Sequence, residues 1–201
     1  MSTYVLIHGG SNRNGGDWAK VKQVLETHSH KVFCPALSAA KHSSLTSHIL
    51  EVLSLIDTNN LKDIILVGHS YGGMVITEVA SKIPEKINRL VYLDAVVPHK
   101  GQSLFDAAIV VGIDLKSYGV EPFKTFTEPA KFDEKIIKAL PKTYIFATQS
   151  EFKKLTSKMF ETAKQKAKED HWNYFKINTT HLAMITQPNE VAKILFQQAY
   201  S

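Results

Sequence analysis

The sequence contains very little cysteine. Cys34 is the single cysteine among 201 residues, so the chain cannot form an intramolecular disulfide. The first residues also lack the charged segment, apolar stretch and cleavage site of a secretory leader. Both absences favour a reducing compartment, and we expect a cytoplasmic protein.

Long hydrophobic runs and metal-ligand clusters are absent as well. The apolar runs, such as residues 64–67, have the length of strands and not the roughly 20 residues needed to cross a bilayer. The nine histidines lack the close pairing with carboxylates or cysteines that is typical of a metal site. We therefore expect a soluble protein with no membrane partner, no metal and no organic cofactor.

The net charge of +5 and the pI near 9.1 raise the question of a nucleic-acid partner. Much of the positive charge lies within residues 153–168, where lysines alternate with apolar residues in the pattern of an amphipathic helix. No recognition-helix motif or basic strand with aromatic residues accompanies these lysines. The charge therefore indicates a solvated helix face, and we expect no nucleic-acid partner.

Short apolar segments alternate with amphipathic segments along the chain. Many of the apolar segments are apolar on both faces, which is typical of a parallel sheet that helices cover on both sides. The predicted strands span residues 3–8, 31–34, 63–67, 89–93, 143–148 and 174–177. The predicted helices span residues 17–27, 44–57, 71–82, 152–168 and 189–200. This order predicts one α/β domain over residues 1–201.

Residues 98–141 interrupt the alternation, because they contain no clear strand and carry Pro122, Pro129 and several glycines. A connection of this length in a compact domain is usually functional. We expect it to form a small cap over the site, with short helices near residues 103–111 and 133–140.

The segment from Gly68 to Gly72 reads Gly-His-Ser-Tyr-Gly, which matches the pattern G-x-S-x-G between a predicted strand and a predicted helix. In such a sharp turn the serine is held in a strained conformation, and glycine is needed on both sides because a side chain would strike the neighbouring elements. A glycine-rich turn without chemistry is the simpler interpretation, but the strand before it and the helix after it favour Ser70 as a nucleophile.

A serine hydroxyl needs a neighbouring base to take its proton. His181 is the candidate, because it follows the last predicted strand and precedes the C-terminal helix. Two backbone amides would stabilise the oxyanion, one after the nucleophile and one after the first strand. These positions are Tyr71 and Gly10, and a simple turn is the alternative interpretation of Gly9-Gly10.

Several motifs together resemble the bacterial and plant esterases related to hydroxynitrile lyases. The motifs are His8-Gly9-Gly10, the run from Gly68 to Met74, the run from Leu90 to Ala95 with Pro98, and the segments 144–149 and 180–185. The resemblance covers most of the chain except the predicted cap. It implies the α/β-hydrolase fold with a parallel sheet of about six strands and the nucleophile strand near its centre.

Two positions separate the branches of that family. Hydroxynitrile lyases usually have a threonine at the position of Gly9 and a lysine at the position of Leu182, so the resemblance favours ester hydrolysis. We expect a carboxylic-ester hydrolase that acts on small esters through an acyl-enzyme. A non-catalytic ligand-binding protein and a hydroxynitrile lyase or C–C hydrolase are the alternatives. A homodimer is compatible with the sequence, which does not define the oligomeric state.

The resemblance also implies an aspartate after Thr-Gln, and this chain has Ser150 there. Asp94 is our preferred acid, because it ends a strand that should lie next to the nucleophile strand, as in the related haloalkane dehalogenases. Glu151, beside the vacant position, is the alternative, and a Ser–His dyad without an acid is a third possibility. A structural carboxylate that binds loop amides is the simpler interpretation of Asp94.

Overall fold

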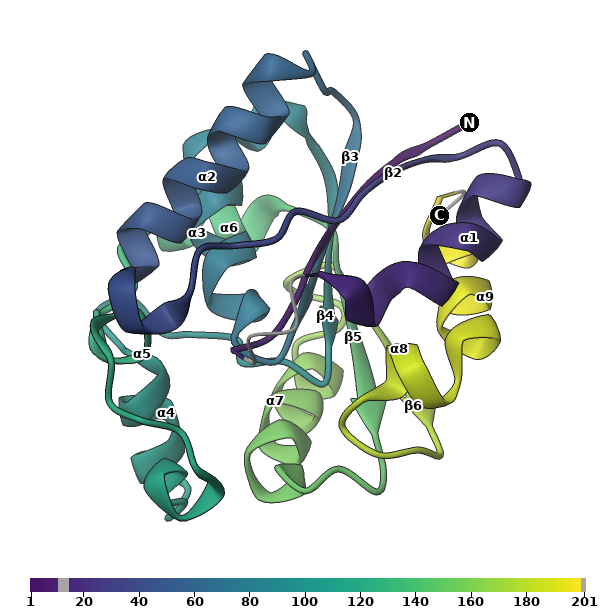
Figure 1. Cartoon of the computed structure of the whole chain (residues 1–201). Coiled ribbons are helices and arrows are strands. Elements are labelled where there is room, and N and C mark those ends of the chain that lie inside the picture. The colour runs from purple at the N-terminus through teal and green to yellow at the C-terminus, as the bar shows by residue number, and fades with distance from the viewer. Residues whose placement is uncertain (11–14, 200–201) are drawn as a thin grey trace.

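The computed structural model describes residues 1–10 and 15–199, and a six-stranded sheet forms its centre (Figure 1). The strand order is β2-β1-β3-β4-β5-β6, and every neighbouring pair is parallel. The strands are β1 (Thr3–Ile7), β2 (Lys31–Phe33), β3 (Ile64–His69), β4 (Ile87–Leu93), β5 (Lys142–Ala147) and β6 (Trp172–Ile177). The predicted α/β class and parallel sheet are therefore confirmed.

Helices cover both faces of this sheet (Figure 1). The α-helices are α1 (Ala19–Thr27), α2 (Leu45–Thr58), α3 (Gly72–Lys82), α4 (Leu104–Val110), α5 (Lys124–Thr127), α6 (Glu134–Ala139), α7 (Lys153–Gln165), α8 (Ala183–Thr186) and α9 (Pro188–Gln198). The 3₁₀ helices are η1 (Gly16–Trp18), η2 (Ala40–His42), η3 (Pro84–Lys86) and η4 (Leu115–Tyr118). One apolar cluster joins the sheet to α2, α3 and α7, and a second joins its other face to α1, α8 and α9.

The strand β1 shows why the sheet needs helices on both sides. Successive side chains of a strand point to opposite faces. Tyr4 and Leu6 belong to the cluster with α1 and α9, whereas Val5 and Ile7 belong to the cluster with α2 and α3. All four side chains are fully buried. A strand that is apolar on both faces is stable only between two helical layers.

Most of the predicted elements begin or end within a few residues of the observed ones. The strand predicted at 174–177 begins earlier, at Trp172, and the helix predicted at 189–200 ends at Gln198. Its predicted last residue, Tyr200, lies outside the described residues. The short helix α8 was not predicted, because a four-residue helix leaves no clear periodic pattern.

The insertion between β4 and β5 divides into two parts. The part from α4 to α5 lies beside the cavity described below, in the region where the sequence predicts a cap. The helix predicted at 133–140 forms as α6 but packs against α3. Glu78 Oε1 accepts the Lys131 amide at 2.7 Å, and Ser81 Oγ accepts the Asp133 amide at 2.8 Å. These contacts hold the second part of the insertion on the α3 layer, away from the expected position over the site.

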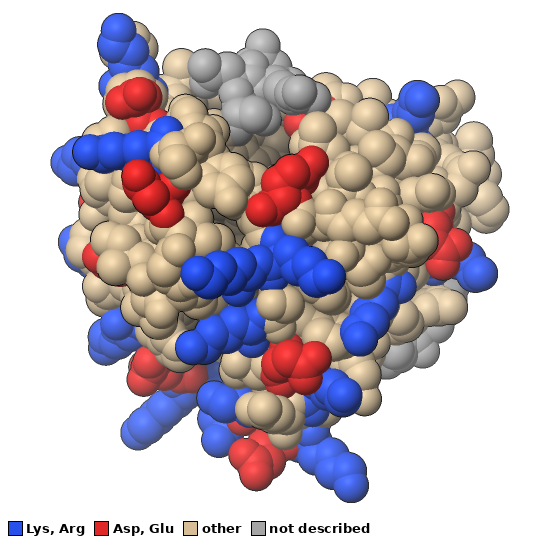
Figure 2. Space-filling view, turned by 90° about the horizontal axis from the view of Figure 1, so that it is seen from below, with Lys and Arg blue, Asp and Glu red and all other residues tan. Residues whose placement is uncertain are grey.

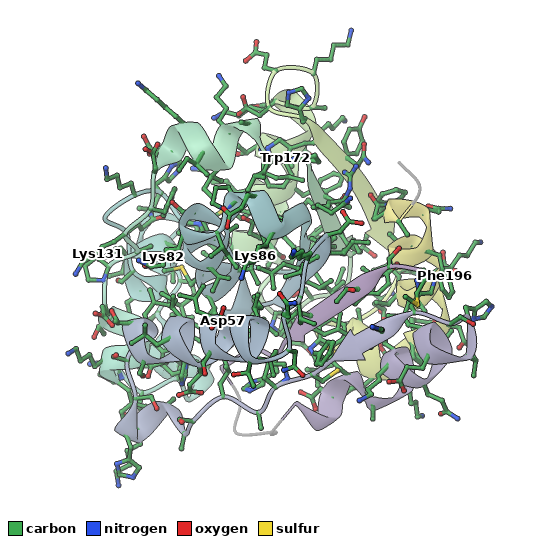
Figure 3. All side chains as sticks on the ribbon, turned by 90° about the horizontal axis from the view of Figure 1, so that it is seen from above. Asp57, Lys82, Lys86, Lys131, Trp172 and Phe196 are labelled. Carbon is green, nitrogen blue, oxygen red and sulfur yellow. The ribbon has the colours of Figure 1, made fainter. Side chains whose placement is uncertain are left out.

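Charged residues are mixed over the surface. On the face in Figure 2, acidic side chains lie among the Lys and Arg side chains. On the opposite face, Asp57 of α2 and Lys86 form an ion pair of 3.7 Å (Figure 3). Within the described residues, none of the helices is long and apolar enough to span a membrane.

Candidate active site

Ser70 lies in a sharp turn between β3, which ends at His69, and α3, which begins at Gly72. Its φ of 54° is in the left-handed region, which is strained for a residue with a side chain. A Cβ on Gly68 would stand 2.6 Å from the Gly72 carbonyl carbon, and a Cβ on Gly73 would collide with the Val96 carbonyl oxygen. The turn therefore requires glycine at both positions, and it places the serine at the N-terminal end of α3.

Asp94 occupies the corresponding position on the neighbouring strand. The strands β3 and β4 pair in register with His69 opposite Leu93, so Ser70 and Asp94 both follow that last pair at the same edge of the sheet. Asp94 is fully buried and also has a positive φ, of 43°. Its Oδ1 accepts the Ala147 amide at 3.2 Å.

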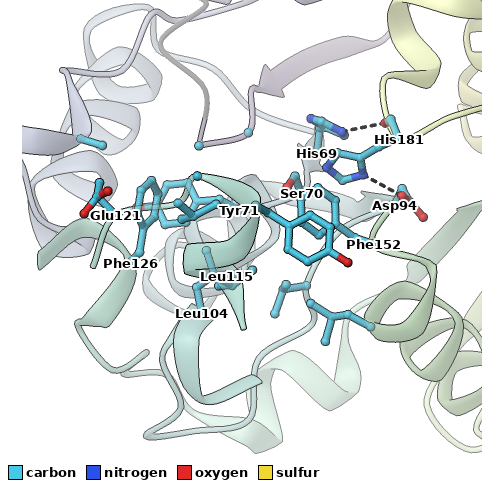
Figure 4. Close-up of a pocket in the computed structure, with 18 of the residues that line it drawn as sticks. His69, Ser70, Tyr71, Asp94, Leu104, Leu115, Glu121, Phe126, Phe152 and His181 are labelled. Carbon is cyan, nitrogen blue, oxygen red and sulfur yellow. Dashed lines mark hydrogen bonds and ion pairs between the residues drawn. The ribbon is translucent and has the colours of Figure 1, made fainter. Parts of the chain in front are cut away.

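His181 connects these two residues. It lies between β6 and α8, and its Nδ1–H donates to Asp94 Oδ2 at 2.7 Å. Nε2 is on the opposite side of the ring, which faces Ser70 across the cavity that both residues line (Figure 4). The Phe152 ring packs edge-on against the imidazole at 4.8 Å between centroids. The arrangement brings a hydroxyl, an imidazole and a carboxylate together in the order that general-base activation of a serine requires.

The other acid predicted from the sequence contacts the same histidine in a different way. Glu151 is exposed, and its Oε2 accepts the backbone amide of His181 at 3.3 Å. Ser150, at the position where the family resemblance implies an aspartate, accepts the Phe152 amide through its Oγ at 3.1 Å. The structure therefore brings Asp94, and not Glu151, to the imidazole ring.

Gly10 and Tyr71 also line the cavity. The loop after β1 approaches the turn closely, because a Cβ on Gly10 would stand 3.8 Å from Tyr71 Cβ and one on Gly9 would stand 3.0 Å from Ser70 Cβ. His8 stabilises this loop. Its Nδ1–H donates to the Gly9 carbonyl at 2.7 Å, and its Nε2 accepts the Leu37 amide at 3.1 Å.

Two buried histidines with contacts in the site did not stand out in the sequence. His48 Nε2–H donates to the Ser38 carbonyl at 2.8 Å, and Nδ1 accepts the Tyr71 hydroxyl at 3.1 Å. His69 Nε2–H donates to the His181 carbonyl at 2.9 Å. Burial lowers the pKa of both histidines below its ordinary value, so both are neutral at pH 7. The position of His69 within the G-x-S-x-G motif is the only sequence signal that points to it.

The cavity above Ser70 has a volume of about 500 Å³ and mostly apolar walls. The cap contributes Leu104, Leu115, Val120, Phe123 and Phe126, and α7 with the residue before it contributes Phe152 and Leu155. Apart from Asp94 and the histidines, the charged residues that line the cavity are Lys41 and Glu121. A small apolar molecule with one polar reacting group fits such a site.

Metal-binding residues do not gather here. Across residues 1–10 and 15–199, no three or more His, Cys, Asp or Glu side chains are grouped so that they could hold a metal ion. The described side chains of the site suit proton transfer and nucleophilic attack.

Named relatives align with about half of the chain. It is 43% identical over 112 residues to a carbendazim-hydrolyzing esterase from Nocardioides sp. strain SG-4G, a match covering 52% of this chain and 46% of that protein. It is 34% identical over 104 residues to salicylic acid-binding protein 2 of Nicotiana tabacum, covering 47% and 40%. The match with polyneuridine aldehyde esterase of Rauvolfia serpentina is 32% over 112 residues, covering 50% and 41%. The chain thus aligns with less than half the length of these relatives.

Solved structures extend the similarity of fold to the whole chain. An extracellular α/β-hydrolase from a Paenibacillus species superposes with a TM-score of 0.80 at 22% identity, with 100% of both chains covered. A pyrethroid hydrolase from Sphingobium faniae JZ-2 gives 0.75 at 19% identity, with 98% and 97% covered. The family model described as alpha/beta hydrolase fold matches residues 4–118. This chain belongs to the α/β-hydrolase family.

Proposed function

We propose that the protein is a carboxylic-ester hydrolase in which Ser70 is the nucleophile, His181 the general base and Asp94 the acid. The observation that carries the proposal is the 2.7 Å bond between His181 Nδ1 and Asp94 Oδ2, in a cavity that Ser70 also lines. A buried carboxylate on Nδ1 fixes the tautomer in which Nε2 is free to accept the serine proton. The esterase names of the relatives support the same reaction class.

In the acylation step, Ser70 Oγ attacks the ester carbonyl carbon while His181 Nε2 takes the hydroxyl proton. The carbonyl electron pair moves to oxygen, and the amides of Gly10 and Tyr71 stabilise the resulting oxyanion. Collapse of this intermediate breaks the bond to the alkoxy group, which receives the proton from His181. Asp94 stabilises the imidazolium that exists between the two proton transfers.

In the deacylation step, water attacks the acyl carbon and His181 accepts the water proton. The bond to Ser70 Oγ breaks, the serine recovers its proton from His181, and the carboxylic acid leaves. Every proton moves between the substrate, water and residues of this chain. No redox partner is needed.

The size and lining of the cavity support a proposal for the class of ester. Its volume of about 500 Å³ lies within the range of sites for small molecules, and its walls are largely aliphatic and aromatic. We therefore infer that the substrates are small esters with an apolar acyl or aryl group. The single cysteine supports our further proposal that the protein is cytoplasmic.

The lyase alternative is less well supported. A threonine at position 9, usual in hydroxynitrile lyases, needs space for its Cβ. That atom would stand 3.0 Å from both His69 Nδ1 and Ser70 Cβ, so these neighbours would have to move by a few tenths of an ångström. Leu182 also lines the cavity where a lyase usually has lysine, so this position offers no cation for a cyanide leaving group.

The test measures hydrolysis of p-nitrophenyl esters of increasing acyl length together with labelling by a fluorophosphonate probe. The wild-type protein should hydrolyse the short esters and take up one probe per chain, and Ser70→Ala should abolish both. His181→Ala should reduce turnover about as severely as Ser70→Ala, because nucleophile and base act as one unit. Persistent labelling of Ser70→Ala would refute the nucleophile, and cleavage of a cyanohydrin without ester hydrolysis would favour the lyase.

A further inference from the structure

The main chain of His181 forms hydrogen bonds, as its ring does. Its carbonyl oxygen accepts a hydrogen bond from His69 Nε2–H at 2.9 Å, and the two imidazole centroids lie 4.4 Å apart (Figure 4). His69 is the residue directly before the nucleophile. The last residue of β3, directly before Ser70, therefore forms a hydrogen bond to the loop that contains His181, although the two histidines are 112 residues apart in sequence.

His69 is suited to this contact because it donates a hydrogen bond without carrying a charge. It is buried, and desolvation together with the nearby His181 lowers its pKa well below the ordinary value. A charged donor at this distance would oppose the imidazolium that forms on His181 during the reaction. The neutral imidazole holds the carbonyl and avoids this repulsion.

Glu151 binds the other polar group of the same residue. Glu151 is exposed and lies in the segment before α7. Its carboxylate accepts the His181 N–H at 3.3 Å. The ring is bound by Asp94, the carbonyl by His69 and the amide by Glu151. His181, the proposed general base in the loop of residues 178–182, is thus bound at three atoms: its ring Nδ1, its carbonyl oxygen and its amide nitrogen.

We propose that His69 and Glu151 are positioning residues that clamp the main chain of His181 and so aim its Nε2 at Ser70. The inference rests on the proposed esterase function for its kinetic consequence. Asp94 bonds to the imidazole at one atom, and the bonds to the carbonyl and the amide fix the main chain from which the ring extends. A displacement of about 1 Å in a reacting group can cost about 10²-fold in rate, so the additional bonds matter for turnover.

The first experiment replaces His69 by leucine, which cannot donate, and by glutamine, which can present an N–H near the position of Nε2. We expect His69→Leu to lower kcat about 10²-fold with KM changed less than about threefold, and His69→Gln to recover most of the loss. His30→Gln is the matched control, since His30 is also buried but lies directly before β2. Thermal unfolding of each variant verifies the fold.

A double mutant separates positioning of His181 from a general effect on the turn. If His69 acts through His181, adding His69→Leu to His181→Ala should reduce the residual rate of probe labelling by less than about twofold. A further large loss in that background would overturn the proposal, because it would show that His69 supports Ser70 directly. Equal kcat in wild type and His69→Leu would also overturn it.

Proton NMR tests whether His69 and Glu151 position His181, even if the protein hydrolyses no ester. The proton shared by His181 Nδ1 and Asp94 Oδ2 should give a downfield proton resonance in the wild type. His69→Leu should broaden or remove it by faster exchange with water, His69→Gln should restore it, and Glu151→Ala should weaken it more than Glu151→Gln. An unchanged resonance in both His69→Leu and Glu151→Ala would refute the clamp. An unreactive wild type with this resonance would instead refute the proposed function.

Discussion

The position where the family resemblance implies an aspartate holds Ser150, and the carboxylate that contacts the His181 ring is Asp94, directly after β4. Asp94 is fully buried and its two oxygens have different partners, the Ala147 amide and the His181 ring. The neighbouring candidate, Glu151, contacts only the main chain of the histidine.

Substituting the two acids separates their roles. Asp94→Asn should lower turnover by up to about 10⁴, because the amide can no longer favour the tautomer with a free Nε2. Glu151→Gln should leave turnover within about threefold of wild type, since glutamine still offers an oxygen to the His181 amide. Steady-state kinetics on one p-nitrophenyl ester check both values. The reverse order of effects would identify Glu151 as the acid.

The loop after β1 has little space for a side chain at Gly9. A methyl group there would press on His69 Nδ1 and Ser70 Cβ, both at 3.0 Å. Gly9→Ala should therefore lower kcat by about tenfold through displacement of the turn. Gly16→Ala is the matched control, because no atom of the described residues lies within 4 Å of the added methyl group. Equal losses in both variants would contradict this explanation.

Asp94 could be predicted from the sequence and His69 could not, for a physical reason. The end of a strand is visible as the end of an apolar run, and neighbouring parallel strands end at the same edge of the sheet. Together with the expectation that the two strands are neighbours, as in the related haloalkane dehalogenases, these facts favour Asp94 as a residue beside Ser70. The contact of His69 with the His181 carbonyl depends on how β6 and the following loop dock, and residue type or spacing does not encode that geometry.

At the scale of elements, the cap segment forms much of the cavity wall. Leu115 of η4 and Phe126 of α5 are buried, and both line the cavity. Phe126 also contacts the Tyr71 ring edge-on at 5.1 Å, next to the expected oxyanion site. The length of a molecule that fits the cavity is thus determined by short helices in the segment where the sequence pattern is least informative.

A larger side chain in this cavity wall should change which esters the protein prefers. We expect Leu115→Trp to reduce kcat/KM for a long-chain or aromatic ester by about tenfold or more and to change the value for an acetate ester little. Ile109→Trp provides the control, because Ile109 on α4 is 66% exposed. A uniform loss on all esters would indicate damage to the catalytic group instead of a smaller cavity.

The sequence predicted the regular layers better than the cap. The helix α7 alternates lysines with buried residues such as Leu155 and Phe160, so its periodicity is plain. The helix α6 was predicted at nearly its observed position but assigned to the wrong neighbour. Its packing depends on Glu78 and Ser81 of α3 accepting backbone amides, and such long-range contacts leave no periodic pattern.

At the scale of the whole molecule, buried neutral histidines make stability depend on pH. Burial lowers the pKa of His30, His48 and His69 in the folded state. The unfolded chain, with a histidine pKa near about 6.5, therefore binds more protons as the pH falls through that value. The free energy of unfolding should accordingly decrease from pH 7 to pH 5.

Denaturant unfolding at several pH values measures this slope. His48→Gln should unfold with a weaker dependence on pH than wild type, whatever its stability at pH 7. His42→Gln should keep the wild-type slope, because His42 is exposed. A wild-type stability that stays constant or rises from pH 7 to pH 5 would contradict the assignment of these histidines as neutral.

The order of the three residues of the proposed triad along the chain has a consequence for biogenesis. Ser70 and Asp94 follow the two central strands, whereas His181 comes after β6, the last strand to be synthesised and one edge of the sheet. A nascent or refolding chain that has assembled only the central strands holds the proposed nucleophile and acid without the proposed base. Such an intermediate should be inert toward esters, so hydrolysis would appear only when the final strand docks. Enzymatic activity would then report the completion of folding more faithfully than helix content does.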